Sequence, residues 1–555
     1  MQALLEGDPR RWTLVEALRL QGQKRGAATF VTFEGGSTCS FAALDRASDA
    51  CATGLQRLGI GAGDRVIIIA ENSLAFLTVF WGVQKRRAIL VPVNVELKGE
   101  LLAHQLRDSA PKAIVTDRDI EDLSALGLSG VSIIRLSRAV ETVTDKARTD
   151  FEQLCSHVDA DAVLSPAPSD ICLILYTSGT SGPSKGVLIP QAHAYLFGLL
   201  QARALGVSRT DRFFIALPMF HVNALLMSLG SCLVTGAQAH VVGKFSASGW
   251  LGQVRASGAT VTNCLGIMAE FILRQPETAG DKTHKLRSVM AVPVSAQWGA
   301  NFEARFGVRL VQVYGMTECN IVSFTGADDP LEPGCVGPIC DEFFDVRILD
   351  PESDHPVPPG SIGEIAVRPK IASAFMQGYF GLPEITIGAW RNLWFHTGDA
   401  GVLDVSGRLH FVDRIGDCIR RRGENISSSE IEQVLGTHAG IAECSVVGVR
   451  IDGAGGEDEI KAYVVRAAAG PDYVELLAWA ELHLPRYAVP RFWEFVDALE
   501  KTATGKVKKK DLRGRGVTDG TWDREAMGAT DQSKGRSHEA ARGLPFMTRT
   551  GGSAP

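Results

Sequence analysis

A stretch of hydroxyl side chains and glycines occupies residues 176–187, directly after an apolar run at 171–175 that predicts a buried strand. Glycine lets backbone N–H groups turn toward an anion, hydroxyl groups add hydrogen-bond donors, and lysine adds a mobile positive charge. These residue types at this spacing predict a loop that holds a polyphosphate. The groups that we expect to contact it belong to Thr177, Ser178, Gly179, Thr180, Ser181 and Lys185.

This loop differs from the P-loop of kinases and ATPases, in which Gly-Lys is followed by Ser or Thr. Here Ser184 precedes the lysine and Gly186 follows it. A flexible surface loop is the alternative interpretation for a generic segment rich in Gly and Ser. The complete string, Tyr176-Thr-Ser-Gly-Thr-Ser-Gly-Pro-Ser-Lys-Gly-Val187, resembles the signature loop of the AMP-forming adenylating enzymes. That family comprises acyl-CoA synthetases, luciferases and the adenylation domains of peptide synthetases.

A second string, Val313-Tyr-Gly-Met-Thr-Glu318, predicts a strand end with an aromatic ring, a glycine and a hydroxyl beside a carboxylate. Open α/β folds bind ligands at the carboxyl edge of their sheet. There the ring of Tyr314 can stack on adenine, and Glu318 can hold Mg²⁺ against phosphate oxygens. An ordinary strand end is the alternative interpretation of this string alone.

In combination with the phosphate loop, this string resembles a second signature of the same family. The resemblance implies that ATP is a substrate and that Thr177 joins Glu318 at the metal. It also places further residues in the nucleotide pocket, namely Gln312, Gly315, Met316 and Thr317.

Two more strings follow in the family's order. In His396-Thr-Gly-Asp399, a carboxylate at a turn can accept hydrogen bonds from both hydroxyls of a ribose. The resemblance gives this role to Asp399 and a ribose or phosphate contact to Arg414. In Thr502-Ala-Thr-Gly-Lys506, it implies that Lys506 bridges the substrate carboxylate and the α-phosphate. Surface charge is the alternative for each of these residues alone.

The segment Pro218-Met-Phe-His-Val222 contains a histidine without charged neighbours. A lone histidine of this kind is usually a hydrogen-bonded core residue, but the resemblance implies that His221 gates the acid pocket. Many family members carry Gly-Gly or Gly-Ala where this chain has Ala291-Val292, so we expect an altered pocket floor. The resemblance makes Val222, Leu265, Gly266 and Ala291 pocket-lining residues. An apolar acyl or aryl group is favoured by Met219, Val222, Leu265 and Ile267.

Residues 305–309 and 421–427 look most like the carnitine/crotonobetaine–CoA ligase branch of the family. No acidic residue stands out beside the expected pocket to hold a trimethylammonium group. The implied reaction adenylates a carboxylic acid with ATP and then transfers the acyl group to CoA. A stand-alone enzyme that loads a carrier protein is the main alternative. A luciferase-type oxygenase would share this pocket, but nothing in the sequence supports it. A catalytically inactive binding protein is disfavoured, because the phosphate loop, Glu318, Asp399 and Lys506 are all intact.

The composition sets broad limits on the function. The 555 residues exceed one ordinary domain, and 45% hydrophobic with 22% charged residues is typical of a globular enzyme. A net charge of −6 argues against nucleic acid as the main partner. The 11 cysteines lack metal-ligand spacing and no secretory signal is visible, which predicts reduced thiols in a cytoplasmic protein. An oligomer is compatible with the sequence.

One long segment, residues 213–243, contains no Asp, Glu, Lys or Arg. Its length would allow a transmembrane span. Prolines, glycines and polar side chains interrupt it, however. We therefore expect a strand, a loop, a buried helix and a second strand, with no transmembrane span.

Up to about residue 400, short β-branched runs alternate with helical patterns, which predicts an α/β fold of layered sheets. Strands with Gly and Pro punctuation after residue 341 predict a β-rich subdomain. The expected domains are an N-terminal adenylation domain at 1–413, a hinge region at 414–423, a small mobile α+β domain at 424–526 and a disordered tail at 527–555. The resemblance places the hinge at Gly416 and implies that Gly423 lets the pantetheine of CoA pass.

Overall fold

The computed structural model describes residues 3–119, 126–136, 148–177, 183–294, 298–332, 334–351, 353–414, 418–421, 424–451, 458–467, 470–500 and 507–526. For Arg414 it describes the backbone only. Several of the predictions fall outside these ranges: those for Ser178, Gly179, Thr180, Ser181, Gly416, Gly423, Lys506 and the tail at 527–555.

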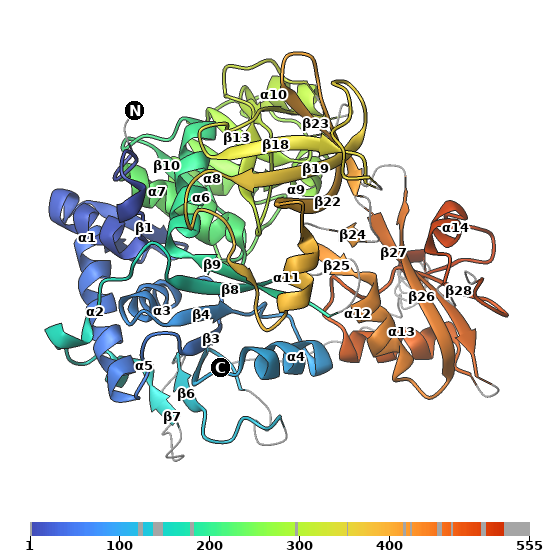
Figure 1. Cartoon of the computed structure of the whole chain (residues 1–555), viewed down its shortest axis with the longest axis horizontal. Helices are drawn as coiled ribbons and strands as arrows, with labels where there is room; N and C mark the ends of the chain where they lie inside the picture. The colour runs from blue at the N-terminus through green and yellow to red at the C-terminus, as the bar shows by residue number, and fades with distance from the viewer. Residues whose placement is uncertain are drawn as a thin grey trace, which may run out of the picture.

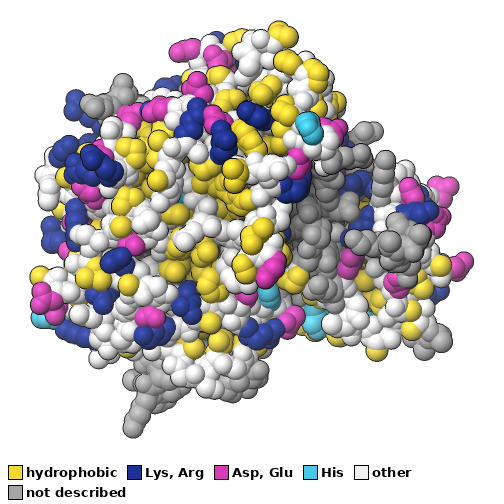
Figure 2. All heavy atoms as spheres, viewed as in Figure 1, with side chains coloured by type: hydrophobic (Ala, Val, Ile, Leu, Met, Phe, Trp, Pro, Cys, Tyr) yellow, Lys and Arg dark blue, Asp and Glu magenta, His cyan; other side chains and the backbone are white. Residues whose placement is uncertain are grey.

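The chain divides into a large portion, which runs to the end of strand β23, and a smaller portion that begins at strand β24 (Figure 1). In Figure 1 the smaller portion lies at the right, with helix α4 of the large portion beside it. Basic and acidic side chains are interspersed over the face shown in Figure 2. The predicted class, a large layered α/β domain with a smaller C-terminal domain, is confirmed.

The first sheet of the large portion has seven strands and is parallel except for its last pair. In spatial order the strands are β14 (Arg309–Val311), β13 (Ser288–Val292), β12 (Val261–Leu265), β10 (Arg212–Ile215), β11 (Gln238–Val241), β1 (Thr29–Phe33) and β2 (Thr38–Ser40).

The second sheet has eight strands. In spatial order they are β20 (Gly378–Tyr379), β9 (Lys185–Pro190), β8 (Ile171–Thr177), β4 (Ile89–Pro92), β3 (Arg65–Ile69), β5 (Ala113–Thr116), β6 (Ser132–Arg135) and β7 (Arg148–Asp150). The strands from β8 to β7 are parallel, whereas β9 and β20 run antiparallel to their neighbours. The hairpin of β8 and β9 therefore brings the two ends of the predicted phosphate loop together.

Helices surround these sheets, and apolar side chains fill the space between the layers. Helix α3 shows how the sequence sets a boundary, because the Ser73 hydroxyl accepts a hydrogen bond from the backbone N–H of Phe76 at 3.1 Å and caps its first turn. The α-helices of the large portion are α1 (Leu14–Arg25), α2 (Phe41–Arg57), α3 (Leu74–Lys85), α4 (Gly99–Ser109), α5 (Phe151–Leu154), α6 (Gln191–Leu205), α7 (Leu229–Thr235), α8 (Trp250–Ser257), α9 (Gly266–Leu273), α10 (Gly299–Phe306) and α11 (Pro383–Ala389). Short turns of 3₁₀-helix form η1 (Pro9–Arg11) and η2 (Ala160–Ala162), and η3 (Asn223–Ser228) is a π-helix.

A mainly antiparallel region completes the large portion, as the Gly and Pro pattern predicts. It contains the hairpin of β15 (Val313–Met316) and β16 (Asn320–Phe324). It also contains a six-stranded sheet made of β17 (Cys335–Pro338), β23 (Arg408–Arg414), β22 (Trp394–Leu403), β19 (Gly363–Pro369) and β18 (Phe344–Leu349), with β21 (Trp390–Arg391) paired to β22.

The smaller portion has its own core, in which Trp493 is fully buried. It begins with the hairpin of β24 (Cys418–Arg421) and β25 (Glu424–Ser427). Its four-stranded sheet consists of β26 (Ile441–Arg450), β27 (Asp458–Arg466), β28 (Phe492–Phe495) and β29 (Trp522–Asp523). Its helices are α12 (Ser428–Gly436), α13 (Tyr473–His483) and α14 (Lys509–Gly514).

The uncharged segment 213–243 forms β10, the π-helix, α7 and β11, as the sequence predicts. Among the residues that the structure describes, no helix is long and apolar enough to cross a membrane.

The string at 313–318 does not end a strand of the parallel sheet, so this part of the sequence prediction was wrong. Strand β14 ends at Val311, and the backbone N–H of Gln312 donates to the Thr325 hydroxyl at 2.8 Å instead of continuing the parallel ladder. The Gln312 carbonyl accepts from the Thr325 N–H at 2.9 Å. The string at 313–318 therefore lies on an antiparallel hairpin and not at the carboxyl end of a parallel strand.

Candidate active site

The phosphate-loop string is held at both ends by sheet structure. Thr177 and Lys185 are paired across β8 and β9, so their backbones lie opposite each other at the loop end of the hairpin. The hydroxyl of Tyr176 donates a hydrogen bond to the Asp108 carboxylate on α4 at 2.6 Å. Burial, followed by the contact with Asp108, raises the pKa of Tyr176, so this phenol stays protonated and joins the end of β8 to α4.

Glu318 lies opposite Thr177, although 141 residues separate them in the chain. The Thr177 hydroxyl donates to Glu318 Oε1 at 3.4 Å, and the Glu318 residue is 6% exposed. The hairpin that delivers Glu318 requires glycine at Gly315, because a Cβ atom there would lie 2.1 Å from the Asn320 carbonyl oxygen. The structure thus joins the two residues that the sequence analysis predicted to share a metal.

Tyr379, which the sequence analysis missed, completes this cluster. Its hydroxyl donates to Glu318 Oε1 at 3.2 Å, and its ring lies 5.0 Å from the Lys185 ammonium group. Burial, followed by the charge of Glu318, raises the pKa of Tyr379, so the phenol remains a donor. No recognisable string surrounds Tyr379, and long-range contacts bring it here: β20 pairs with β9, and the Met376 N–H donates to the Glu318 carbonyl at 3.0 Å.

A buried histidine, also missed, fixes the turn before Glu318. His193 on α6 donates from Nε2 to the Thr317 carbonyl at 2.9 Å, and its Nδ1 lies 3.2 Å from Asn320 Nδ2. Burial lowers the pKa of His193 to about 4, so the ring is neutral at physiological pH and can donate at one nitrogen and accept at the other. His193 therefore positions the hairpin turn through hydrogen bonds without adding charge to the site.

The second and third strings meet through Tyr314 and Asp399. The Tyr314 hydroxyl donates to Asp399 Oδ2 at 2.9 Å, and the two residues are 6% and 3% exposed. The Tyr314 ring stacks on Phe411 with the centroids 6.0 Å apart. Burial, then the negative charge of Asp399, raises the pKa of Tyr314. Asp399 is also paired in the sheet with Arg414, so three predicted nucleotide residues lie together.

The loop around Asp399 is shaped by Glu364, which the sequence analysis did not single out. Glu364 Oε1 accepts from the Gly398 backbone N–H at 3.0 Å, and Oε2 lies 2.8 Å from His396 Nδ1. The Thr397 hydroxyl accepts from the Asp399 N–H at 3.1 Å and donates to a strand carbonyl. These contacts hold the backbone of the string 396–399 in one conformation.

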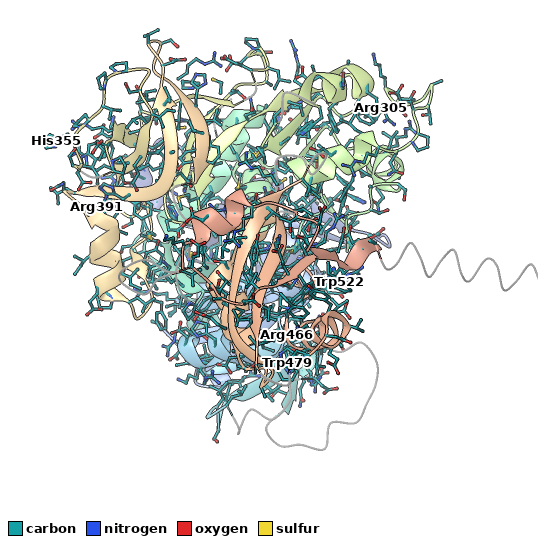
Figure 3. All side chains as sticks on the ribbon, turned by 90° about the vertical axis from the view of Figure 1, so that its right-hand side faces the viewer. Arg305, His355, Arg391, Arg466, Trp479 and Trp522 are labelled. Carbon is teal, nitrogen blue, oxygen red and sulfur yellow. The ribbon has the colours of Figure 1, made fainter. Side chains whose placement is uncertain are left out.

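An arginine at the edge of the sheet supports this arrangement from outside. Arg391 contacts Asp354 at 3.0 Å and Glu364 at 3.3 Å. Its hydrogen bond to Asp354 holds the pKa of that carboxyl below its usual range. Figure 3 shows Arg391 and His355, the neighbour of Asp354, on the same side of the molecule. Arg391 is thus a structural residue and lies outside the cluster of predicted ATP contacts.

Gln312 uses its side-chain amide within the protein. Its Nε2 donates to the carbonyls of Glu332 and Cys335, both at 2.9 Å, and the residue is 3% exposed. These bonds tie the start of the hairpin to the loop before β17. The predicted adenine contact of Gln312 stays a prediction.

The residues expected in the acid pocket occupy the ends of β12 and β13 and the loop before the π-helix. His221, Val222 and Leu265 are partly exposed there, and a Cβ atom at Gly266 would lie 2.6 Å from the Pro293 carbonyl oxygen. Glycine is therefore required at this close approach.

Ala291 lies differently from its neighbours in the expected pocket. Its side chain is fully buried in a cluster on the far side of β13, together with Val289. Val292, one residue later, packs against the same apolar cluster as Val222 and Met316. Strand alternation thus directs Val292 toward the cluster of Val222 and Met316, whereas Ala291 faces the cluster against which Leu265 packs. Met219 is fully buried as well, so its apolar side chain belongs to the core and does not indicate the polarity of the pocket.

A narrow cavity lies between the two portions of the molecule. Tyr176, Ser184 and His221 line it from the large portion, and Ile426, Ile431 and Tyr487 line it from the smaller portion. The smaller portion therefore approaches both the end of the phosphate-loop hairpin and the predicted gate of the acid pocket.

Glu318 and Thr177 offer oxygen ligands of the kind that Mg²⁺ prefers. The described residues contain no group of three or more His, Cys, Asp or Glu side chains that could hold a metal ion. Mg²⁺ bound together with a nucleotide usually takes one or two carboxylates and completes its shell with phosphate oxygens and water. Glu318, with the Thr177 hydroxyl at 3.4 Å, fits that role.

Comparisons with known proteins agree with this geometry. Residues 18–380 match the model of the AMP-binding enzyme family, and residues 430–506 match the AMP-binding enzyme C-terminal domain. The chain is 32% identical over 492 residues to the crotonobetaine/carnitine–CoA ligase of Salmonella paratyphi C, covering 85% of this chain and 93% of the relative. The ligase of the same name from Salmonella typhi is equally similar, at 32% identity over the same shares.

Solved structures share the fold. The o-succinylbenzoate CoA synthetase of Bacillus subtilis, bound with a product analogue, has a TM-score of 0.78 at 24% identity and covers 91% of this chain and 99% of its own. ATP-bound MatB from Rhodopseudomonas palustris has a TM-score of 0.66 at 26% identity, covering 90% and 98%. With the matched models spanning both portions and the signature residues gathered at one site, the chain belongs to the AMP-binding enzyme family.

Proposed function

We propose that this protein is an AMP-forming carboxylate–CoA ligase. The carboxylate of the acid attacks the α-phosphorus of ATP, forming an acyl-adenylate and releasing pyrophosphate. The thiol of CoA then attacks the acyl carbon, forming a thioester and releasing AMP. The observation that carries the proposal is the convergence of Thr177, Glu318, Tyr314 and Asp399 from three separate strings.

The residues divide the work of the first step. The loop 177–185 holds the phosphates, Asp399 and Arg414 hold the ribose, and the pocket around Tyr314 receives the adenine. Glu318 and Thr177 would hold Mg²⁺, which would neutralise phosphate charge when bound. Lys506 bridges the carboxylate and the α-phosphate. Catalysis of this kind depends mainly on positioning and charge neutralisation.

The second step needs a different surface of the smaller domain. We propose the boundaries 1–413, 414–423 and 424–526, with Gly416 as the pivot and Gly423 beside the path of pantetheine. The cavity between His221 and Tyr487 supports this view, because it shows the smaller portion next to the predicted acid pocket. One rotation can present Lys506 for adenylation and the region of Gly423 for thiol attack.

CoA is favoured over a carrier protein as the thiol acceptor. The curated relatives are named CoA ligases and match 85% of this chain. Ten cysteines in the described part of the chain are free thiols, which supports a reducing compartment such as the cytoplasm. Crotonobetaine, carnitine and the acids of the structural relatives are candidate substrates for a first panel.

The products test the proposal directly. Incubation with ATP, Mg²⁺, CoA and a panel of carboxylic acids is expected to yield AMP, pyrophosphate and an acyl-CoA in equal amounts, because the phosphate loop lacks the Gly-Lys-[Ser/Thr] order of kinases. Chromatography of nucleotides and thioesters measures this. Formation of ADP and phosphate would contradict adenylation, and acyl transfer to a carrier protein without activity on CoA would favour the alternative.

A second experiment tests the pivot. Gly416→Pro fixes φ and removes a backbone donor, so rotation of the smaller domain should be blocked. If the blocked state is the adenylating one, a single turnover should release pyrophosphate without forming a thioester. Gly416→Ala keeps the donor and is the matched control. Normal thioester synthesis by the proline variant would show that Gly416 is not the pivot.

A further inference from the structure

A buried chain of amide groups runs from α6 to the π-helix beside the predicted acid pocket. Gln201 Nε2 donates to Asn263 Oδ1 at 2.9 Å. Asn263 Nδ2 donates to Asn223 Oδ1 at 2.7 Å and to Ser228 Oγ at 3.1 Å. Gln201, Ser228 and Asn263 are 0%, 1% and 4% exposed, whereas Asn223 is partly exposed. The chain therefore starts in the core and ends at an accessible side chain.

The hydrogen bonds of Gln201 and Asn263 determine whether the oxygen or the nitrogen of the Asn223 amide faces outward. In the observed orientation both N–H groups of Asn263 are used, and of the buried side-chain atoms of Gln201, Asn263 and Ser228 only Gln201 Oε1 has no hydrogen-bond partner. Reversing the amides would leave one N–H of Asn263 and both N–H groups of Gln201 without acceptors. Buried donors without acceptors are rarer in proteins than under-used carbonyl oxygens, so the observed orientation is favoured. Asn223 thus turns Oδ1 inward, and its Nδ2 has no hydrogen-bond partner among the described residues.

The location of Asn223 connects it to the acid pocket. Side chains at 221–223 are partly exposed, and those from 224 to 228 are buried, so Asn223 marks the end of the accessible surface. Its partner Asn263 lies two residues before Leu265, which is paired with Val292. Asn223 is also the first residue of the π-helix, an element that occurs frequently at functional sites.

We propose that Asn223 is a specificity-determining residue that donates from Nδ2 to a hydrogen-bond acceptor on the acyl part of the acid. The substrate class is then a carboxylic acid with a carbonyl or hydroxyl oxygen along its chain. An unsubstituted acid would leave this donor unpaired once water is displaced, and sites built to hydrogen-bond a substrate discriminate strongly against analogues that lack the group. This inference rests on the proposed ligase function and refines the apolar acid expected from Val222 and Leu265.

The test compares matched acids that differ by one carbonyl. Pentanoate, hexanoate and heptanoate are paired with 4-oxopentanoate, 5-oxohexanoate and 6-oxoheptanoate, and kcat/KM is measured by pyrophosphate release with CoA present. The wild-type protein is expected to favour at least one oxo acid over its partner. Asn223→Leu removes the donor, and Asn223→Asp keeps the inward oxygen but replaces the donor by an acceptor. Each change should lower the preference for that oxo acid by about 10- to 100-fold.

Ser228→Ala is the matched control, because it removes another polar group from the same chain on its buried side. Its oxo-to-alkyl preference should stay within a few-fold of wild type. Wild-type preference for every unsubstituted acid, unchanged preference in both Asn223 variants, or an equal change in Ser228→Ala would overturn the role of Asn223. Absence of AMP formation with any acid would instead refute the ligase function itself, so the two failures are distinguishable.

Discussion

Lys506→Ala is expected to slow acyl-adenylate formation by several orders of magnitude, which corresponds to roughly 3–5 kcal/mol of transition-state stabilisation. In the proposed role of Lys506, its ammonium group neutralises negative charge on the carboxylate and the α-phosphate as the new bond forms. If the proposed rotation of the smaller domain carries Lys506 away before thiol attack, the loss should be confined to the first step. Pyrophosphate exchange measures the first step, and conversion of a synthetic acyl-adenylate with CoA measures the second.

Lys508→Ala is the matched control for this experiment. The Lys508 side chain is 43% exposed and lies 3.8 Å from Glu500, a contact of little energetic weight at the surface. It should leave both half-reactions within a few-fold of wild type. Equal loss of both half-reactions in Lys506→Ala would contradict domain alternation and indicate a static site. Retention of both would mean that Lys506 is an ordinary exposed lysine.

Glu318→Gln should lower kcat by about 10²–10³-fold at ordinary Mg²⁺ concentrations. Glutamine keeps the shape of the side chain and can still contact Thr177 and Tyr379, but it removes the negative charge that would attract the metal. The loss should be relieved in part by raising Mg²⁺, because weaker metal binding can be overcome by mass action. Steady-state kinetics over a range of Mg²⁺ concentrations measures both effects. Near-normal turnover at low Mg²⁺ would show that the metal is held elsewhere.

Tyr379→Phe separates charge from position in the same cluster. It removes the 3.2 Å hydrogen bond to Glu318 and leaves the carboxylate charge in place. We expect a smaller loss, about tenfold, as for a single hydrogen bond to a charged group. If Tyr379→Phe reduced activity as much as Glu318→Gln, placement of the carboxylate rather than its charge would limit catalysis.

Local sequence was sufficient where a signature or a periodic pattern is contained in one segment. Helix α3 begins directly after Ser73, whose hydroxyl caps the first turn, so a contact within four residues sets this boundary. The strings at 176–187, 313–318 and 396–399 indicated the family because their residue types and order are specific. Short-range patterns of this kind reflect local hydrogen bonding and burial, which act over a few residues.

Only the tertiary structure determined which side chains share a site. Tyr379 and His193 lie in segments without a recognisable string, and strand pairing and helix packing bring them to Glu318 and Thr317. The direction of Ala291, away from Val222 and Met316, depends on the alternation of a strand whose two faces are both apolar.

The same holds for Asn223 and for the path of the chain at Gln312. The orientation of the Asn223 amide depends on Asn263 and Gln201, which lie 40 and 22 residues away in the sequence. The end of the parallel strand before Gln312 depends on the hydrogen bonds of Gln312 to Thr325. A single sequence specifies which groups can donate or accept a hydrogen bond. It does not specify their partners, because buried polar groups pair with whatever groups the packed layers bring within about 3 Å.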